Sequence, residues 1–222
     1  MGYGALLTDA QGVPFYIDGT RPLTLINKFV INVPGDNSGT VYSQDLYNND
    51  GAVRFVFLQS NSSNAFSAEW LQLDNNVWRF YSSRISKTVT VFIFGYANQP
   101  VPAWGVAIYD AAGSCILTNE SKVLRDVRQV GDVTNDAASG YQIDTTVGGS
   151  WAVAPAFTGI LNGVDNSTGQ PRPIVAYFYS SAYFDGANTR ITSHADRSTA
   201  GLTSATYSNA RNTITYVNTS RY

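Results

Sequence analysis

The stretch Val89-Thr90-Val91-Phe92-Ile93-Phe94 consists almost entirely of β-branched and aromatic residues. Such side chains fit the pleated surface of a sheet. A short, almost wholly apolar run is typical of a strand that is covered on both faces. We therefore expect residues 89–94 to form a central strand, with the rest of the chain arranged around it.

Segments with alternating apolar residues precede this run. Residues 24–33 place Phe29, Ile31 and Val33 on one face and end at Pro34-Gly35-Asp36, and residues 53–57 alternate in the same way. This period of two predicts half-buried strands. Further on, the polar triplet Asp74-Asn75-Asn76 separates two strand-like segments and predicts a β-hairpin, formed by residues 70–73 and 77–81.

The composition of the 222 residues supports an all-β protein. Residues that normally fill surface helices are scarce, with two Glu, three Lys and one Met in the whole chain. Against these stand 20 Val, 20 Thr, 14 Tyr and 11 Phe, which favour strands, and 19 Gly, which favour turns. Only 14% of the residues are charged, so the surfaces are suited to packing against other subunits or to binding sugars.

The second half of the chain differs in character. Residues 129–150 are polar and glycine-rich and are interpreted as a linker or a long excursion, and residues 195–212 as a long exposed loop. Residues 174–179 alternate cleanly, and residues 214–217 form a last strand. We expect an antiparallel β-sandwich over residues 1–128, followed by a smaller β-rich domain or extension over residues 129–222.

Several classes of function are excluded by what the sequence lacks. A net charge of −2 offers no basic surface for nucleic acid. No run of 18 apolar residues predicts membrane insertion, and the first residues do not resemble a signal peptide, so we expect synthesis in a cytosol. One Cys and one His argue against a multi-cysteine zinc site and a His-rich metal site, and no glycine-rich phosphate loop is present. We expect no cofactor, no metal ion and no catalytic residues.

One local pattern occurs twice, at a constant offset of 101 residues. The decapeptide from Tyr3 to Gly12 aligns with the one from Trp104 to Gly113, with Gly, Asp, Ala and Gly matched in place. Asp followed by Gly three residues later fits a type I turn, so residues 3–17 are predicted to form a hairpin. Either two unrelated hairpins share the same turn chemistry, or two equivalent hairpins belong to one sandwich.

These two segments also carry a family resemblance. Residues 2–12 and the segment Pro102-Ala103-Trp104-Gly105-Val106-Ala107-Ile108-Tyr109-Asp110-Ala111-Ala112-Gly113 resemble a family of small tail proteins of long-tailed bacteriophages, encoded near the tail-tip and fibre genes. The resemblance covers about residues 1–128, and its motif is structural. It implies a non-enzymatic virion component at the tail tip or fibre that binds other phage tail proteins, made in the host cytoplasm. The symmetry of tail tips further implies a homotrimer.

The aromatic excess suggests where recognition would occur. Tyrosine gives a large contact area at a small entropic cost, with a hydroxyl for hydrogen bonds. Tyrosines on one strand face also commonly form the packed side of a sheet. The recognition surface that we predict, facing a host surface receptor or glycan, consists of Trp151, Tyr177, Tyr179, Tyr183, Phe184, Asn188 and Arg190. The alternative is a carbohydrate-binding or receptor-binding module that uses this C-terminal surface without an architectural role.

Catalytic and metal-binding interpretations are weaker. A small hydrolase centred on His194 and Asp196 would be a third function, but no nucleophile elbow surrounds any serine, and an exposed loop histidine is the simpler interpretation. The two glutamates, Glu69 and Glu120, offer little for glycoside hydrolysis. Cys115 is interpreted as a buried, inert thiol. A calcium site is the last alternative, with candidate ligands Asp132, Asp136 and Asp144.

Overall fold

The computed structural model describes residues 21–35, 41–64, 66–110, 112–134 and 139–222. Within these ranges the chain is all-β, with sixteen strands and one four-residue helix, α1 (Ser139–Gln142). The strands form an eleven-stranded main sheet, a three-stranded sheet and a two-stranded hairpin. The predicted all-β class is confirmed. No helix in the described ranges is long and apolar enough to span a membrane.

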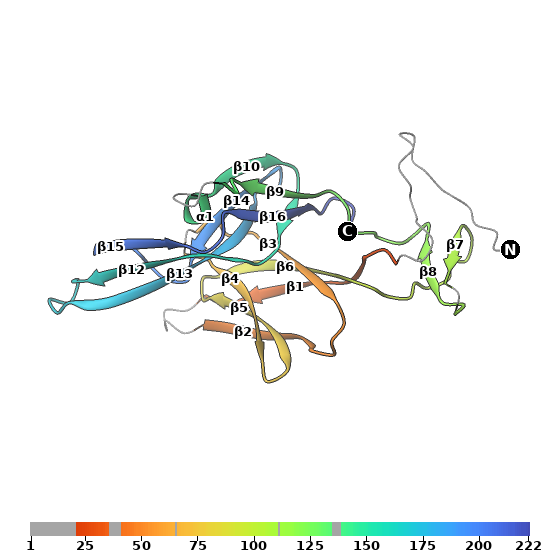
Figure 1. The fold of residues 1–222 in the computed structure, drawn as a ribbon, viewed down its shortest axis with the longest axis horizontal. Helices are drawn as coiled ribbons and strands as arrows, with labels where there is room; N and C mark the ends of the chain where they lie inside the picture. The colour runs from red at the N-terminus through yellow and green to blue at the C-terminus, as the bar shows by residue number, and fades with distance from the viewer. Residues whose placement is uncertain (1–20, 36–40, 65, 111, 135–138) are drawn as a thin grey trace.

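Three strands make up the first part of the main sheet: β1 (Thr24–Val33), β3 (Arg54–Ser60) and β6 (Lys87–Gly95). β6 lies between the other two and is antiparallel to both (Figure 1). Val89, Val91 and Ile93 enter a core on one face, while Phe92 and Phe94 enter a core on the other. The predicted central strand is thus confirmed, and burial on both faces explains its continuous apolar sequence.

A second, three-stranded sheet packs on one face of this region. Asn75 and Asn76 both have positive φ angles, 49° and 64°, which is the turn geometry that joins twisted antiparallel strands. The predicted hairpin at this turn is therefore confirmed. Phe80 is fully buried between the two sheets, in one core with Val89 and Val91. This sheet is formed, in spatial order, by β2 (Val41–Asn48), β5 (Val77–Ser83) and β4 (Glu69–Asp74).

The second half of the chain extends the same main sheet. Its body strands are β9 (Val127–Gly131), β10 (Asp144–Gly148), β11 (Trp151–Val153), β14 (Asn188–Ala195) and β16 (Thr213–Asn218). β3 pairs antiparallel with β11 and parallel with the long strand β13 (Arg172–Phe184), so the main sheet is mixed. Residue 128, where the sequence predicts a domain boundary, lies inside β9, which pairs with β16. The main sheet therefore continues across that position.

Two local predictions in this half are wrong. Residues 129–150 do not form a linker, because they contain the end of β9, α1 and β10. Residues 195–212 do not form a long loop, because they contain the strand β15 (Leu202–Asn209). β9 and β10 are the outermost strands in the order of the main sheet, and β15 pairs with a single neighbour. Backbone pairing stabilises such strands while their side chains stay polar, so hydrophobic periodicity does not reveal them.

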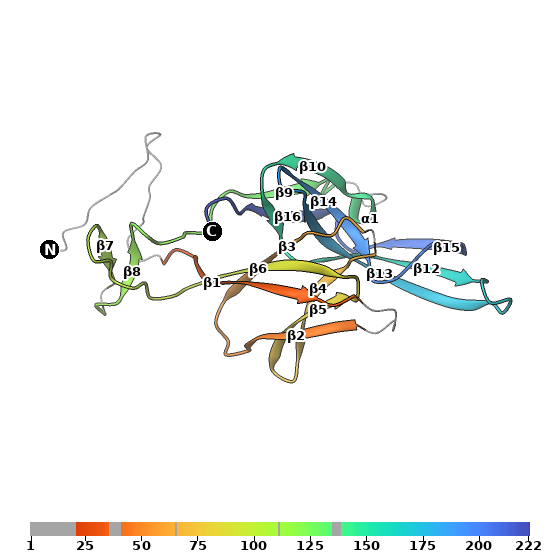
Figure 2. The same cartoon turned by 180° about the vertical axis from the view of Figure 1, so that it is seen from behind.

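A three-stranded arm projects from one end of the molecule. β12 (Phe157–Asp165) pairs antiparallel with β13 on one side and with β15 on the other. β13 has 13 residues, and its first half pairs with β12 while its second half pairs with β14 in the body. Figures 1 and 2 show this arm at the end of the molecule opposite to the hairpin of β7 and β8. The arm is thus continuous with the main sheet through a single shared strand.

The opposite end carries the hairpin of β7 (Ala107–Tyr109) and β8 (Cys115–Thr118). The carboxylate of Asp110 accepts hydrogen bonds from the backbone N–H groups of Ala112 and Ser114, at 3.0 and 2.8 Å. Gly113 closes the turn with a φ of +78°. The turn predicted from the repeated decapeptide is confirmed for this copy, while the aligned copy at residues 3–12 lies outside the described residues.

Candidate functional site

Four of the predicted recognition residues lie on β13, and the other three lie elsewhere in the structure. Tyr177 and Tyr179 lie in the half of β13 that pairs with β12. Tyr183 lies further along the same strand, opposite Arg190 of β14. By the period of two, these three tyrosines share one face of β13, and Phe184 lies on the other. β13 thus carries four of the seven predicted residues, of which Phe184 lies on the opposite face from the three tyrosines.

Tyr177 and Tyr179 belong to a row of five aromatic side chains drawn from both sheets. Trp70 of β4 stacks on Tyr179 of the main sheet at a centroid distance of 4.9 Å and on Tyr81 of β5 at 5.7 Å. Phe157 of β12 contacts both Tyr177 and Tyr179. Sequence reasoning missed Trp70, Tyr81 and Phe157, because their strands only meet in the folded chain. We call these five residues the aromatic row.

The stacking of the aromatic row uses ring surface that a ligand would otherwise contact. Tyr179 and Trp70 are partly buried in the contact between the two sheets, and burial raises the pKa of Tyr179 to about 12. Phe157 and Tyr177 remain the most accessible members, with 36% and 39% of their surface exposed. The aromatic row therefore joins the two sheets, and offers only these two side chains to a partner.

The remaining predicted residues make contacts within the chain. Trp151 is buried in the core beside Tyr216, and the guanidinium of Arg128 lies over its ring. Arg190 forms a bidentate ion pair with Asp144, at 2.7 and 2.6 Å. Asn188 lies at the start of β14, where its backbone N–H donates to the Asp185 carboxylate. The expectation that Trp151 is part of an exposed surface is wrong, because the ring fills the core under β16.

His194 is not an exposed loop residue, which was the simpler interpretation of its sequence. It lies in β14 with 3% of its surface exposed, and its Nδ1 is 3.4 Å from the backbone oxygen of Ser67. Asp196 accepts a hydrogen bond from the backbone N–H of Tyr177 and pairs with Arg197. Within the described part of the chain, therefore, no hydrogen bond or ion pair links His194 to Asp196 as a hydrolytic triad would require.

His194 borders a buried polar cluster that the sequence did not predict. Lys87 of β6 is 2.7 Å from Glu69 of β4, with side-chain exposures of 0% and 2%. The Lys87 ammonium also donates to the Ser67 hydroxyl at 2.6 Å, and the Ser181 hydroxyl of β13 donates to Glu69 at 3.1 Å. Burial lowers the pKa of Lys87, and the Glu69 carboxylate opposes that shift. The cluster links the two sheets with charge-assisted hydrogen bonds in place of apolar contacts.

We expect this arrangement to make the stability of the protein depend on pH through His194. Burial lowers the pKa of His194, and the nearby ammonium of Lys87 and guanidinium of Arg190 add to that shift while Glu69 opposes it. Below about pH 6.5 the unfolded chain binds a proton that the folded chain does not, so stability falls as the pH decreases. A single group limits the slope to about 1.4 kcal/mol per pH unit.

Urea unfolding between pH 7.5 and 5 measures this slope. His194 is the only histidine of the chain, so the His194→Gln variant should have a flatter dependence over this range, whatever its absolute stability. An equally steep loss of stability in that variant would show that His194 is not the titrating group.

Large apolar side chains are exposed at the hairpin end of the molecule, and none of the described residues covers them. Trp104 is 81% exposed, and Val101 and Val106 are more than half exposed. Gly105, next to Trp104, has a φ of +120°, and a side chain at that position would collide with Asn119. Asn119 in turn accepts a hydrogen bond from the N–H of Val106 at 3.1 Å. We call Val101, Trp104, Val106 and Tyr109 the hairpin face.

Hydrogen bonds and one ion pair connect the hairpin to the segments before it. Arg21 bridges Asp110 in the turn and Asn98 in the preceding segment, at 2.8 and 2.9 Å. Gln99 donates from its backbone to the oxygen of Cys115 and from its side chain to Thr24 of β1. Cys115 is buried, as the sequence predicts. The hairpin face is therefore tied to the segments before it through the contacts of Arg21 and Gln99.

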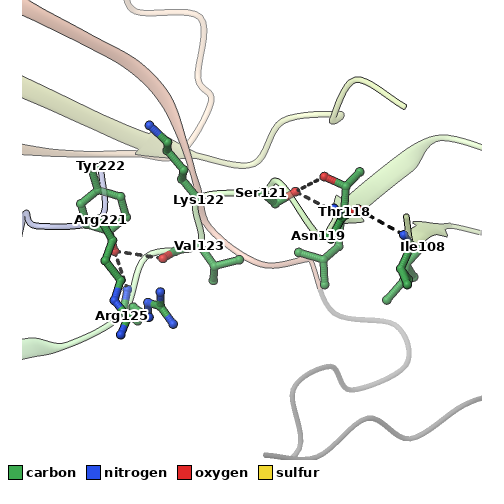
Figure 3. A pocket seen from close by; sticks show the side chains of 11 residues that line it. Ile108, Thr118, Asn119, Ser121, Lys122, Val123, Arg125, Arg221 and Tyr222 are labelled. Atoms are coloured by element: carbon green, nitrogen blue, oxygen red, sulfur yellow. Dashed lines mark hydrogen bonds between the residues drawn. The ribbon is translucent and has the colours of Figure 1, made fainter. Parts of the chain in front are cut away.

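A groove of about 380 Å³ lies between this hairpin and the last residues of the chain (Figure 3). Its apolar lining includes Ile108, Leu117 and Val123. Tyr222 forms one wall, with its hydroxyl donating to the backbone oxygen of Val123 at 2.9 Å and its ring packed edge-on against Phe94. The charged side chains that line the groove are all cationic, namely Lys122, Arg125 and Arg221.

The described residues contain no group of three or more His, Cys, Asp or Glu side chains placed to hold a metal ion. Of the carboxylates considered for calcium, Asp132 accepts two hydrogen bonds from Thr134, and Asp144 pairs with Arg190. Asp136 lies outside the described residues.

Comparison of the chain with protein-family models, with curated proteins and with solved structures found no match.

Proposed function

We propose that this chain is a non-enzymatic structural component of a bacteriophage tail, at the tail tip or associated with a fibre. The observation that carries the proposal is the hairpin face, where Trp104 is 81% exposed just before β7. Single exposed apolar side chains are normal on a surface, but the four large side chains of the hairpin face are exposed within nine consecutive residues, which is typical of a site of interaction. The hairpin also contains the segment whose sequence resembles the tail-protein family.

Further support comes from the shape and the chemistry of the surface. The molecule has two projections at opposite ends, the hairpin and the arm. With 14% charged residues, its surface favours extensive contact with neighbours in an assembly over free diffusion. In this proposal the hairpin face docks on another tail protein, and the arm faces the host or a fibre partner. Repeated copies would give the assembly its avidity.

We expect Trp104→Ser to reduce incorporation of the chain into particles at least tenfold, because the variant loses the largest apolar anchor of the interface. The measurement is quantitative mass spectrometry of purified virions from the phage that encodes the chain. Val133→Ser is the matched control, since Val133 is also largely exposed but lies on the loop after β9. Both variants should unfold at the same urea concentration as the unchanged chain.

Two results would contradict the proposal. The unchanged chain could be missing from purified particles, or it could accompany heads when heads and tails are separated.

The expected trimer is tested separately. Light scattering of the purified protein should give about three times the chain mass of 24.1 kDa. A monomer in solution that enters tails in other than multiples of three would refute the threefold arrangement alone.

A further inference from the structure

The groove beside the hairpin has an unbalanced charge. Lys122, Arg125 and Arg221 line it, and no Asp or Glu side chain does. Among the described residues, none of these three cations forms an ion pair. Arg128, Arg172 and Arg211 also lack an ion pair among the described residues, so the distinctive feature of the groove is that three such cations line it together. Their convergence makes the groove suited to a negatively charged partner.

Two of the cations meet at one end of the groove. Arg125 and Arg221 both act electrostatically on the hydroxyl of Tyr222, and both lower its pKa against the larger effect of burial, which raises it. The Asp126 carboxylate acts on the same hydroxyl in the opposite direction but does not line the groove. Guanidinium groups bind carboxylates through paired, parallel hydrogen bonds. This end of the groove is therefore built for a carboxylate.

The other end of the groove is apolar. Ile108 and Leu117, from the two strands of the hairpin, lie there, and Figure 3 shows Ile108 at the opposite side of the groove from Arg125 and Tyr222. Ile108 lies opposite Leu117 in the hairpin register. An apolar side chain fits against this end, because it removes the exposed part of Ile108 from water, while Leu117 is already 3% exposed. The groove thus combines an apolar subsite with a cationic one.

We infer that the groove binds an extended, acidic segment of a partner protein, with an apolar side chain at the hairpin end and a carboxylate at the arginine end. In an extended chain, residues i and i+2 point to the same side and lie about 7 Å apart. A segment with an apolar residue and, further along the same side, Asp or Glu would present suitable groups to both subsites, and a peptide with acidic residues two and four positions later covers two such spacings. The inference rests on the proposed function only in taking this partner to be another virion protein.

The test uses two peptides and the full chain. The first peptide is acetyl-Thr-Ile-Thr-Asp-Thr-Asp-amide, and the second replaces both Asp with Asn. Binding is followed by methyl NMR at Ile108, Leu117 and Val123. The acidic peptide should shift these signals saturably, bind at least tenfold more tightly than the Asn peptide, and lose that advantage at 0.5 M salt, where exposed charges are screened.

Variants locate the charge preference in the groove. Arg125→Gln combined with Arg221→Gln should abolish the preference for the acidic peptide, while Arg172→Gln on the distant arm should preserve it. All three arginines are exposed, so these variants should fold normally. Equal binding of the two peptides, absence of any methyl shift, or a preference that survives in the double variant would each overturn the inference.

Two further measurements identify the occupant of the groove. If the same methyl signals shift with protein concentration in the absence of peptide, a second copy of this chain occupies the groove and the foreign acidic segment is refuted. The Trp104→Ser variant, which should enter particles at least tenfold less, should still bind the acidic peptide. If the acidic peptide does not bind, the proposed role in the tail is unaffected. If the unchanged chain is not incorporated into particles, the proposed binding of an acidic segment in the groove is unaffected.

Discussion

Replacing Lys87 with methionine is expected to lower the free energy of unfolding by about 3–5 kcal/mol, because the change leaves the carboxylate of Glu69 buried without its counter-ion. Glu69 is 2% exposed, and its remaining partners are the hydroxyl groups of Ser67 and Ser181. Hydroxyl groups do not neutralise a buried charge, so the penalty is that of an unpaired ion. Urea or guanidinium unfolding measures the loss directly.

Removal of both charges provides the decisive comparison. The double variant Glu69→Gln, Lys87→Met should recover most of the lost stability, because buried ion pairs contribute less to stability than either ion costs when it is left alone. It also keeps the experiment informative if Lys87→Met alone does not fold. The matched control is Arg190→Met, which breaks the half-exposed pair with Asp144 and should cost less than about 1 kcal/mol. Equal losses at the two sites would contradict the argument.

The second large effect is expected at the interface between the two sheets. Phe80→Ala should destabilise the protein by about 3–5 kcal/mol, since it removes a fully buried ring and leaves a cavity among packed neighbours. Phe80 comes from the three-stranded sheet and shares its core with Val89 and Val91 of the main sheet. A loss of this size would show that the two sheets are stabilised as one unit.

Phe55 is the matched control for this experiment. It lies on β3 of the main sheet, but 45% of its surface is exposed. Phe55→Ala should therefore cost much less, because exposed aromatic side chains gain little from folding. Thermal and urea unfolding should rank the two variants in the same order. A Phe80→Ala variant as stable as Phe55→Ala would mean that the sheets do not pack as described.

Five strands of the first half, β1, β3, β4, β5 and β6, could be predicted because their sequences carry strong local patterns, whereas β2 was not predicted. The apolar run at residues 89–94 requires burial on both faces, and the Asn75-Asn76 turn specifies a tight hairpin. β15 could not be predicted in the same way, since most of its side chains are exposed and only pairing with β12 makes it a strand. Partners that lie far apart in the sequence provide no local pattern.

The buried ion pair and the aromatic row show the same limit. Glu69 and Lys87 are 18 residues apart and come from different sheets. One indication was present: Lys87 is in phase with Val89 and Val91, so it falls on the buried face of the predicted central strand. Trp70 and Tyr179 offered no such indication, because stacking across two sheets depends on how the sheets are placed.

The shared strand β13 has a mechanical consequence. At about 3.3 Å per residue, its 13 residues reach about 40 Å from the arm into the body. The hydrogen bonds of a sheet run nearly perpendicular to its strands. A pull on the tip of the arm along β13 therefore loads its bonds to β14 together, in shear, and they cannot open one after another like a zipper. The arm can therefore transmit a sustained pulling force along its axis into the body of the protein.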